Sequence, residues 1–135
     1  MNNSQLIKSA LEARRFSYSP YSGFAVGAAL LCADGSVYTG CNIENSAFSP
    51  TNCAERTAFF KAVSEGKKEF EKIAVVGGNA GSEPSNYCSP CGVCRQVMKE
   101  FCKADFEIII AINEKDYKMM TLDEILPASF DKREV

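Results

Sequence analysis

The sequence predicts an α/β domain in which helices flank a mixed β-sheet. Segments with apolar residues at helical spacing alternate with short apolar runs that are typical of buried strands. The last two of these runs are separated only by NEKD, which is too short for a parallel crossover, so we expect them to pair antiparallel. No repeat or linker divides the chain, and we expect residues 1–135 to form one domain.

The first half of the chain is expected to contain two helices separated by a hairpin. Apolar residues at helical spacing predict an opening helix over about residues 4–15. The run FAVGAALLCADGSVYTGC predicts two strands that turn at Asp34-Gly35, a strong hairpin signal. A second helix is expected over residues 52–66, because a glycine at its end is a good helix terminator.

The second half is expected to alternate strands with helices. KIAVVGG predicts a short buried strand, and residues 91–102 predict a third helix. FEIIIAI and YKMM predict the last two strands, and Thr121 with Glu124 forms a capping box that opens a short final helix. The expected order is therefore helix, strand, strand, helix, strand, helix, strand, strand, helix.

Composition limits the classes of function. The chain is 46% hydrophobic and 24% charged, which is typical of a globular domain. Its net charge is -2 and its basic residues are scattered, which argues against a nucleic-acid partner. It has no apolar run of transmembrane length and no N-terminal signal pattern, so we expect a cytoplasmic protein without a membrane partner.

The chain has seven cysteines and no histidine. A Ser-His or Cys-His catalytic pair is therefore excluded, and a transition-metal site has to be built from thiolates and carboxylates. In a reducing compartment such cysteines indicate metal binding or redox chemistry more often than disulfides.

Three cysteines, Cys88, Cys91 and Cys94, are spaced three residues apart in YCSPCGVC. Two predicted helices begin at cysteines, Cys53 and Cys91, and a helix N-terminus favours the thiolate that a metal binds. If the two helix starts meet, Cys53, Cys91 and Cys94 converge and leave one position of a zinc tetrahedron open, as in catalytic sites. The alternatives are a redox pair or a closed structural-zinc interaction module with Cys88 as fourth ligand.

Two charged residues follow Cys53 in the predicted helix. Glu55 lies in the first turn, close enough to a metal to transfer protons; alternatively it caps the helix together with Asn52. Arg56 lies on the same helix face as Cys53 and can donate to its sulfur, which would offset ligand charge; alternatively it is an ordinary solvated arginine. Taken alone, the capping interpretation of Glu55 is the stronger one.

Taken together, Cys-Ala-Glu followed by Pro-Cys-x-x-Cys is the three-cysteine form of the zinc nucleoside and nucleobase deaminase signature. The sequence resembles the short cytidine deaminases in GCNIEN, NCAERTA and SPCG-CRQV, and the resemblance extends from YSPYSGFAVGAALL to EILPASF. It implies a three-layer α/β/α domain with a five-stranded mixed sheet. It further implies one Zn²⁺ per chain bound by Cys53, Cys91 and Cys94, with Cys88 outside the site.

The resemblance also implies an activity. Zinc would activate a water molecule for attack on C4 of the pyrimidine, and Glu55 would carry protons between water, ring N3 and the departing amine. Cytidine and deoxycytidine would become uridine and deoxyuridine with release of ammonia, as in pyrimidine salvage. The nearest alternative within the enzyme class is a deaminase of a modified nucleoside such as blasticidin S.

Substrate contacts are implied by the same resemblance: Phe24, Asn42, Glu44, Ala54, Ser89 and Phe130. Asn42 and Glu44 would bind the ribose, chiefly its 3′-hydroxyl, and the Glu44 carboxylate would repel a phosphate. Phe24 would pack on the base, and backbone groups near Ala54 and from Ser89 would hold the amide edge of the base. Phe130 would come from a neighbouring subunit, because the short members are homotetramers with shared active sites.

Overall fold

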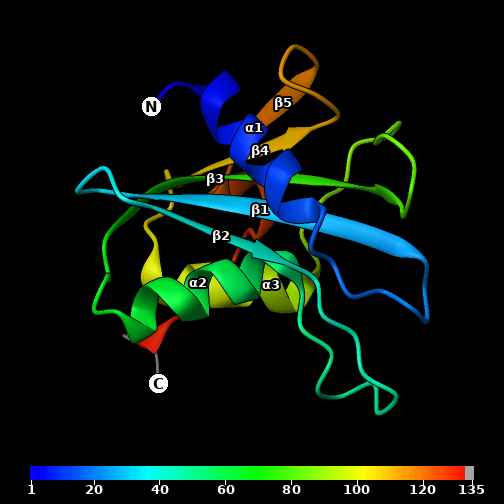
Figure 1. Ribbon diagram of the computed structural model, residues 1–135. Helices are drawn as coiled ribbons and strands as arrows, with labels where there is room; N and C mark the ends of the chain where they lie inside the picture. The colour runs from blue at the N-terminus through cyan, green and yellow to red at the C-terminus, as the bar shows by residue number, and fades with distance from the viewer. Residues whose placement is uncertain (133–135) are drawn as a thin grey trace.

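The computed structural model describes residues 1–132, and its centre is one five-stranded sheet with helices on both faces (Figure 1). The element order predicted from the sequence is confirmed. The elements are α1 (Asn3–Arg14), β1 (Phe24–Cys32), β2 (Val37–Cys41), α2 (Ala54–Ser64), β3 (Phe70–Asn79), α3 (Gly92–Phe101), β4 (Glu107–Ala111), β5 (Tyr117–Thr121) and α4 (Leu122–Ile125).

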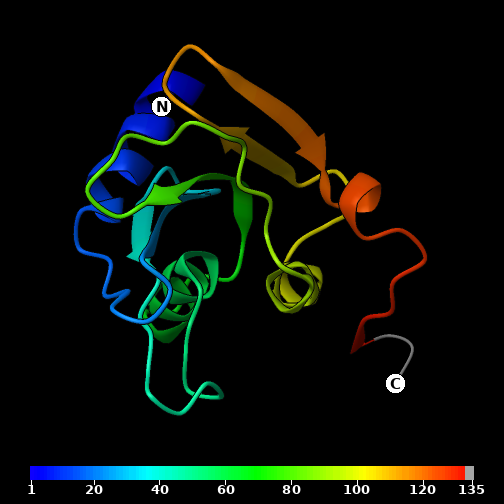
Figure 2. The ribbon, with the colours of Figure 1, turned by 90° about the vertical axis from the view of Figure 1, so that its right-hand side faces the viewer.

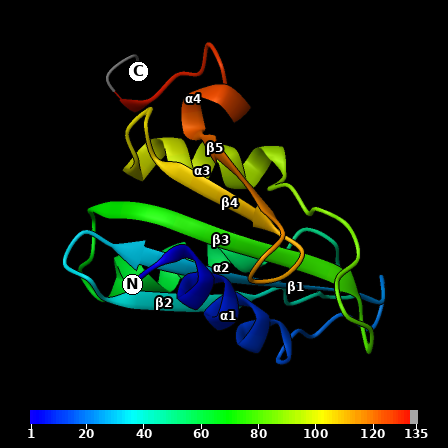
Figure 3. The same ribbon diagram turned by 90° about the horizontal axis from the view of Figure 1, so that it is seen from above.

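The strands lie in the order β2-β1-β3-β4-β5, which Figure 3 shows from above. Only β3 and β4 are parallel, and the connection between them contains α3. The pairs β1–β2, β1–β3 and β4–β5 are antiparallel, which confirms the prediction for the last two strands. The capping box of Thr121 and Glu124 is also present at the start of α4.

Two clusters of buried apolar side chains lie on opposite faces of the sheet, and Figure 2 shows the helices that cover these faces. Successive side chains of a strand point to opposite faces. Leu30 of β1 therefore packs in the cluster that contains Phe59 of α2 and Met98 of α3. Its neighbour Ala29 packs in the cluster that contains Leu6 of α1. This confirms the three-layer α/β/α arrangement, with α2 and α3 sharing one face.

The start of α2 lies unusually close to β2 at Gly40. A Cβ atom at this position would lie 2.5 Å from the carbonyl oxygen of Ala54 and 2.6 Å from the backbone nitrogen of Ala58. Since real Cβ atoms do not approach other atoms so closely, glycine is what allows the first turn of α2 to rest directly on the strand.

Helices α2 and α3 lie side by side and begin at the same end of the molecule (Figures 1 and 2). Their N-cap residues are Cys53 and Cys91, each with an extended backbone conformation. The positive ends of two helix dipoles are thus directed at one place. Within residues 1–132, no helix combines the length and the apolar character that crossing a bilayer requires.

Candidate active site

Three cysteine sulfurs meet where α2 and α3 begin. Cys53 Sγ lies 3.8 Å from Cys91 Sγ, and Cys91 Sγ lies 3.5 Å from Cys94 Sγ. All three sulfurs lie within 4.8 Å of one another, and residues 1–132 contain no other comparable group of potential metal ligands. Zinc–sulfur bonds of about 2.3 Å at tetrahedral angles place sulfurs about 3.8 Å apart, so this spacing fits zinc.

Arg56 contacts this cluster from the first turn of α2. Its Nη2 donates to Cys53 Sγ at 3.1 Å, as the three-residue spacing predicts. Hydrogen bonds from the Cys94 thiol and from Arg56 lower the pKa of Cys53 to about 5, despite its burial. The site thus holds at least one thiolate at neutral pH, which is the form that binds a metal.

Glu55 is the one buried charged side chain among the described residues, with 4% of its surface exposed. Burial, reinforced by the charge of Cys53, raises its pKa to about 7. The capping interpretation of Glu55 is wrong, because the N-cap of α2 is Cys53 and no side chain caps it. The Asn52 amide instead donates to Thr57 Oγ1 at 3.1 Å. A carboxylate with this pKa can accept and release a proton near pH 7.

A pocket of about 310 Å³ opens beside the cluster, near the lower end of the size range of small-molecule sites. Its lining brings together most of the predicted substrate contacts, the predicted catalytic residue and two of the predicted metal ligands: Phe24, Asn42, Glu44, Ala54, Ser89, Glu55, Cys53 and Cys91. Phe130 does not line it; the side chain is exposed, and its carbonyl oxygen accepts a hydrogen bond from Gln96 Nε2.

The pocket also contains Cys88, which the sequence interpretation had set aside as a bystander. Cys88 is not part of the group of three cysteines, as the family resemblance implies, although its spacing alone would allow it. Its half-buried side chain lies close to Gly77 in the pocket wall, as does the Phe24 ring. Burial and the negative charges of Glu55 and Cys53 raise its pKa to about 11, so the thiol is neutral. A closed structural site with Cys88 as fourth ligand has no support in this arrangement.

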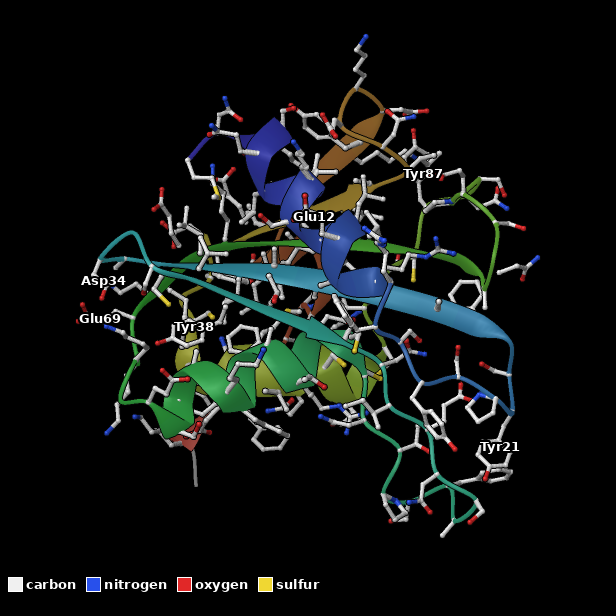
Figure 4. The ribbon with its side chains drawn as sticks, viewed as in Figure 1. Glu12, Tyr21, Asp34, Tyr38, Glu69 and Tyr87 are labelled. Atoms are coloured by element: carbon white, nitrogen blue, oxygen red, sulfur yellow. The ribbon has the colours of Figure 1, made fainter. Side chains whose placement is uncertain are left out.

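The loop that carries Cys88 and Ser89 is fixed through Tyr87 (Figure 4). Tyr87 Oη donates to Asp116 Oδ1 at 2.5 Å, and Lys118 Nζ lies 4.4 Å from the centre of the Tyr87 ring. The β4–β5 turn thereby holds the segment that precedes the cysteines of α3.

The Asn42 side chain uses three of its four hydrogen-bonding positions within the protein. Its Oδ1 accepts from the backbone nitrogen of Val26 at 2.9 Å and from Ser17 Oγ at 2.5 Å. Its Nδ2 donates to the carbonyl oxygen of Phe24 at 2.8 Å. One N–H of the amide is left to donate into the pocket.

The Glu44 carboxylate, which lines the same pocket as Asn42, is also held by hydrogen bonds. Its Oε1 accepts from the backbone nitrogens of Tyr21 and Ser22 at 3.0 and 3.1 Å, and its Oε2 accepts from Ser22 Oγ. These hydrogen bonds, led by the Ser22 hydroxyl, lower the pKa of Glu44, so it is ionised. Asn42 and Glu44 together leave one donor and one acceptor, which is what a single hydroxyl group requires.

Comparison with known protein families identifies the family to which this chain belongs. A model described as "Cytidine and deoxycytidylate deaminase zinc-binding region" matches residues 1–110. The chain belongs to this deaminase family. The zinc fit argued from the sulfur distances therefore agrees with the family, and the five-stranded mixed sheet agrees with the fold of its solved members.

Relatives match over nearly the whole chain. A cytidine deaminase of Sporosarcina psychrophila is 48% identical over 135 residues, covering 100% of this chain and 96% of the relative. One from Halalkalibacterium halodurans is 49% identical over 130 residues, covering 96% and 95%. The crystal structure of a Burkholderia pseudomallei cytidine deaminase superposes with a TM-score of 0.87 at 44% identity, covering 96% of this chain and 100% of that one.

A more distant relative has a different substrate in its name. A blasticidin-S deaminase of Bacillus cereus is 32% identical over 110 residues, covering 79% of this chain and 77% of the relative. All of these relatives are named deaminases, and the two that are about half identical to this chain are named cytidine deaminases.

Proposed function

We propose that this protein catalyses the zinc-dependent hydrolytic deamination of cytidine and deoxycytidine to uridine and deoxyuridine, with release of ammonia. The observation that carries the proposal is the buried Glu55 carboxylate next to three converging cysteines, two of which line a pocket of about 310 Å³ together with Glu55. Three protein ligands leave the fourth position of a zinc tetrahedron free for chemistry.

Cys53, Cys91 and Cys94 would hold the zinc ion, one per chain. The chemistry that zinc supplies when bound is the activation of water for attack on C4 of the pyrimidine. Arg56 donates to Cys53 Sγ and so offsets part of the negative charge that three thiolates place on the centre.

Glu55 would manage the protons of the reaction. Its carboxylate takes the proton of the attacking water, passes one to ring N3 and delivers one to the departing amine, so that water and cytidine yield uridine and ammonia. A pKa raised to about 7 by burial keeps both protonation states accessible during this cycle. The pocket wall excludes bulk water from the same carboxylate.

The opposite side of the pocket would bind the sugar. Asn42 and Glu44 offer one donor and one acceptor to the 3′-hydroxyl, and Phe24 packs against the base. Backbone groups of Ala54 and Ser89 would hold the amide edge of the pyrimidine. Because Glu44 is ionised, a substrate phosphate nearby would be repelled, which favours nucleosides over nucleotides and nucleic acid.

A homotetramer with shared active sites would complete this pocket. Phe130 lies outside the pocket of its own chain and exposes 58% of its surface, as an aromatic residue donated to a neighbouring subunit would. Tyr21 and Phe48, beside the pocket, also expose aromatic surface to such a neighbour. We place this enzyme in cytoplasmic pyrimidine salvage, with a free nucleoside as its substrate and without a nucleic-acid or membrane partner.

The test is ammonia release by purified protein of known zinc content from cytidine, deoxycytidine, cytidine monophosphate, cytosine and blasticidin S. We expect turnover of the first two and little of the phosphate. Activity confined to blasticidin S would keep the zinc chemistry and overturn the ribose contacts. Inactivity on all five substrates, from folded protein with one zinc per chain, would contradict the proposal.

A further inference from the structure

Ser22 joins the two loops that line the sugar side of the pocket. Its Oγ donates to Glu44 Oε2 and accepts from the backbone nitrogen of Phe24 at 3.0 Å. One hydroxyl group thus lies between the acidic residue and the backbone of the aromatic residue that faces the base. Ser22 itself lines the pocket and is exposed toward it.

The two contacts fix the direction of the Ser22 hydroxyl. The N–H of Phe24 occupies a lone pair of Oγ, and the proton of Oγ points to Glu44. A serine hydroxyl has one proton to donate, so this proton is not available to the substrate. The proton of the Ser22 hydroxyl therefore serves Glu44 and not the sugar.

The hydrogen bonds around Glu44 leave it one acceptor position. Oε1 is filled by the backbone nitrogens of Tyr21 and Ser22, and one lone pair of Oε2 is filled by the Ser22 hydroxyl. Without that hydroxyl the carboxylate would keep only the contacts at Oε1 and could turn about them. Its free lone pair would then no longer keep a fixed direction in the pocket that Asn42 also lines.

We propose that Ser22 is a positioning residue for sugar recognition: its hydroxyl aims the one free lone pair of Glu44 at the substrate hydroxyl that Asn42 also contacts. The inference rests on the proposed function and extends it to a residue to which the family resemblance assigned no role. Because a preset carboxylate loses no side-chain freedom when substrate binds, the effect falls on affinity more than on chemistry.

Two substrates that differ only at the 3′ position separate positioning from structure. Deoxycytidine carries the 3′-hydroxyl and 2′,3′-dideoxycytidine lacks it. We expect Ser22→Ala to raise KM for deoxycytidine about tenfold, the effect of one misdirected hydrogen bond to a charged group, with kcat within about twofold. On dideoxycytidine the same variant should keep kcat/KM within about twofold of wild type.

The chain supplies matched controls. Ser36→Ala removes a similar serine-to-carboxylate hydrogen bond, from Ser36 Oγ to Asp34 Oδ1 at 2.6 Å, in the β1–β2 turn. It should leave both substrates unaffected. Ser22→Thr keeps the hydroxyl at an exposed position and should restore the deoxycytidine KM.

Binding gives a readout that does not depend on turnover. In a Glu55→Gln background, calorimetric titration with deoxycytidine should show about tenfold weaker binding when Ser22→Ala is added. Equal losses on deoxycytidine and dideoxycytidine would show that Ser22 only supports the fold of the pocket, and no loss on either would remove the role altogether. If wild type does not turn over deoxycytidine, the proposed function fails first and the inference falls with it.

Discussion

The two sides of the pocket are built in different ways. The proposed catalytic side comes from the starts of α2 and α3, where Cys53, Glu55 and Cys94 are placed by helices that pack on the sheet. The proposed sugar side comes from loops, where Asn42 and Glu44 are held by hydrogen bonds to backbone groups and serines. Regular elements thus place the chemistry, and hydrogen-bonded loops place the specificity. Substitutions on the two sides should therefore change different kinetic constants.

The largest expected effect is the loss of a zinc ligand. Cys94→Ala should remove zinc and bring ammonia release below detection, because two thiolates cannot hold the metal at this open site. Cys102→Ala, at the other end of α3, should keep the zinc. Zinc content and ammonia release of both variants are the measurements. Retention of one zinc per chain by Cys94→Ala would contradict the ligand assignment.

The second-largest expected effect is that of replacing Glu55, the proposed proton carrier. Glu55→Gln should lower kcat for cytidine on the order of 10³-fold, because the amide cannot move protons. Zinc content should not change, since Glu55 is not part of the sulfur cluster. Glu65→Gln is the control at the far end of α2, where Glu65 accepts from Tyr38 Oη. Nearly full activity of the Glu55→Gln protein would show that Glu55 has only a structural role.

Glu55→Gln should also stabilise the zinc-free protein. Burial raises the pKa of Glu55 from 4.5 to about 7, which corresponds to roughly 3 kcal/mol of folding free energy. The folded state favours the protonated carboxyl, so stability is present below the unfolded pKa and is lost as pH rises through 7. Glutamine resembles the protonated form and avoids this loss.

Thermal unfolding of zinc-free wild type and Glu55→Gln at pH 5 and pH 8 measures this effect. The variant should melt roughly 10 °C higher at pH 8 and only slightly higher at pH 5. An equal difference at both pH values would assign the effect to packing rather than to ionisation.

The sugar side should give a smaller effect on a different constant. Glu44→Gln should raise KM for cytidine about tenfold with little change in kcat, because a charged hydrogen bond to the ribose is lost. The discrimination against cytidine monophosphate should weaken at the same time, because the repelling charge is gone. Steady-state kinetics on both compounds tests this, and a fall in kcat alone would place Glu44 in the chemistry.

The smallest expected effect is that of Cys88. The neutral thiol lies in the pocket wall close to Gly77, outside the sulfur cluster. Cys88→Ala should therefore keep zinc and kcat and change KM by at most about tenfold. Zinc loss in this variant would instead make Cys88 a ligand.

The sequence predicted the fold well because the signals for helices, strands and turns lie in neighbouring residues of the chain. Periodicity located the helices and strands, and the length of NEKD decided the pairing of β4 with β5. The capping alternative for Glu55 was wrong by one position, since the chain stays extended through Cys53 and the helix starts after it.

Other features depend on loops that meet only after folding. Cys88 shares its spacing with the ligand cysteines, and only the path of its loop places it in the pocket wall. Ser22 gave no signal except its place two residues before Phe24, because its partner Glu44 comes from a distant segment. Sequence patterns identify such residues poorly, as no local rule connects them.

The most direct test of the division between the two sides is to measure kcat and KM for cytidine in Glu55→Gln and Glu44→Gln side by side, with zinc content determined for each. We predict that both variants keep one zinc per chain, that Glu55→Gln loses kcat, and that Glu44→Gln raises KM. If both variants changed the same constant, the assignment of chemistry to the helix starts and recognition to the loops would be contradicted.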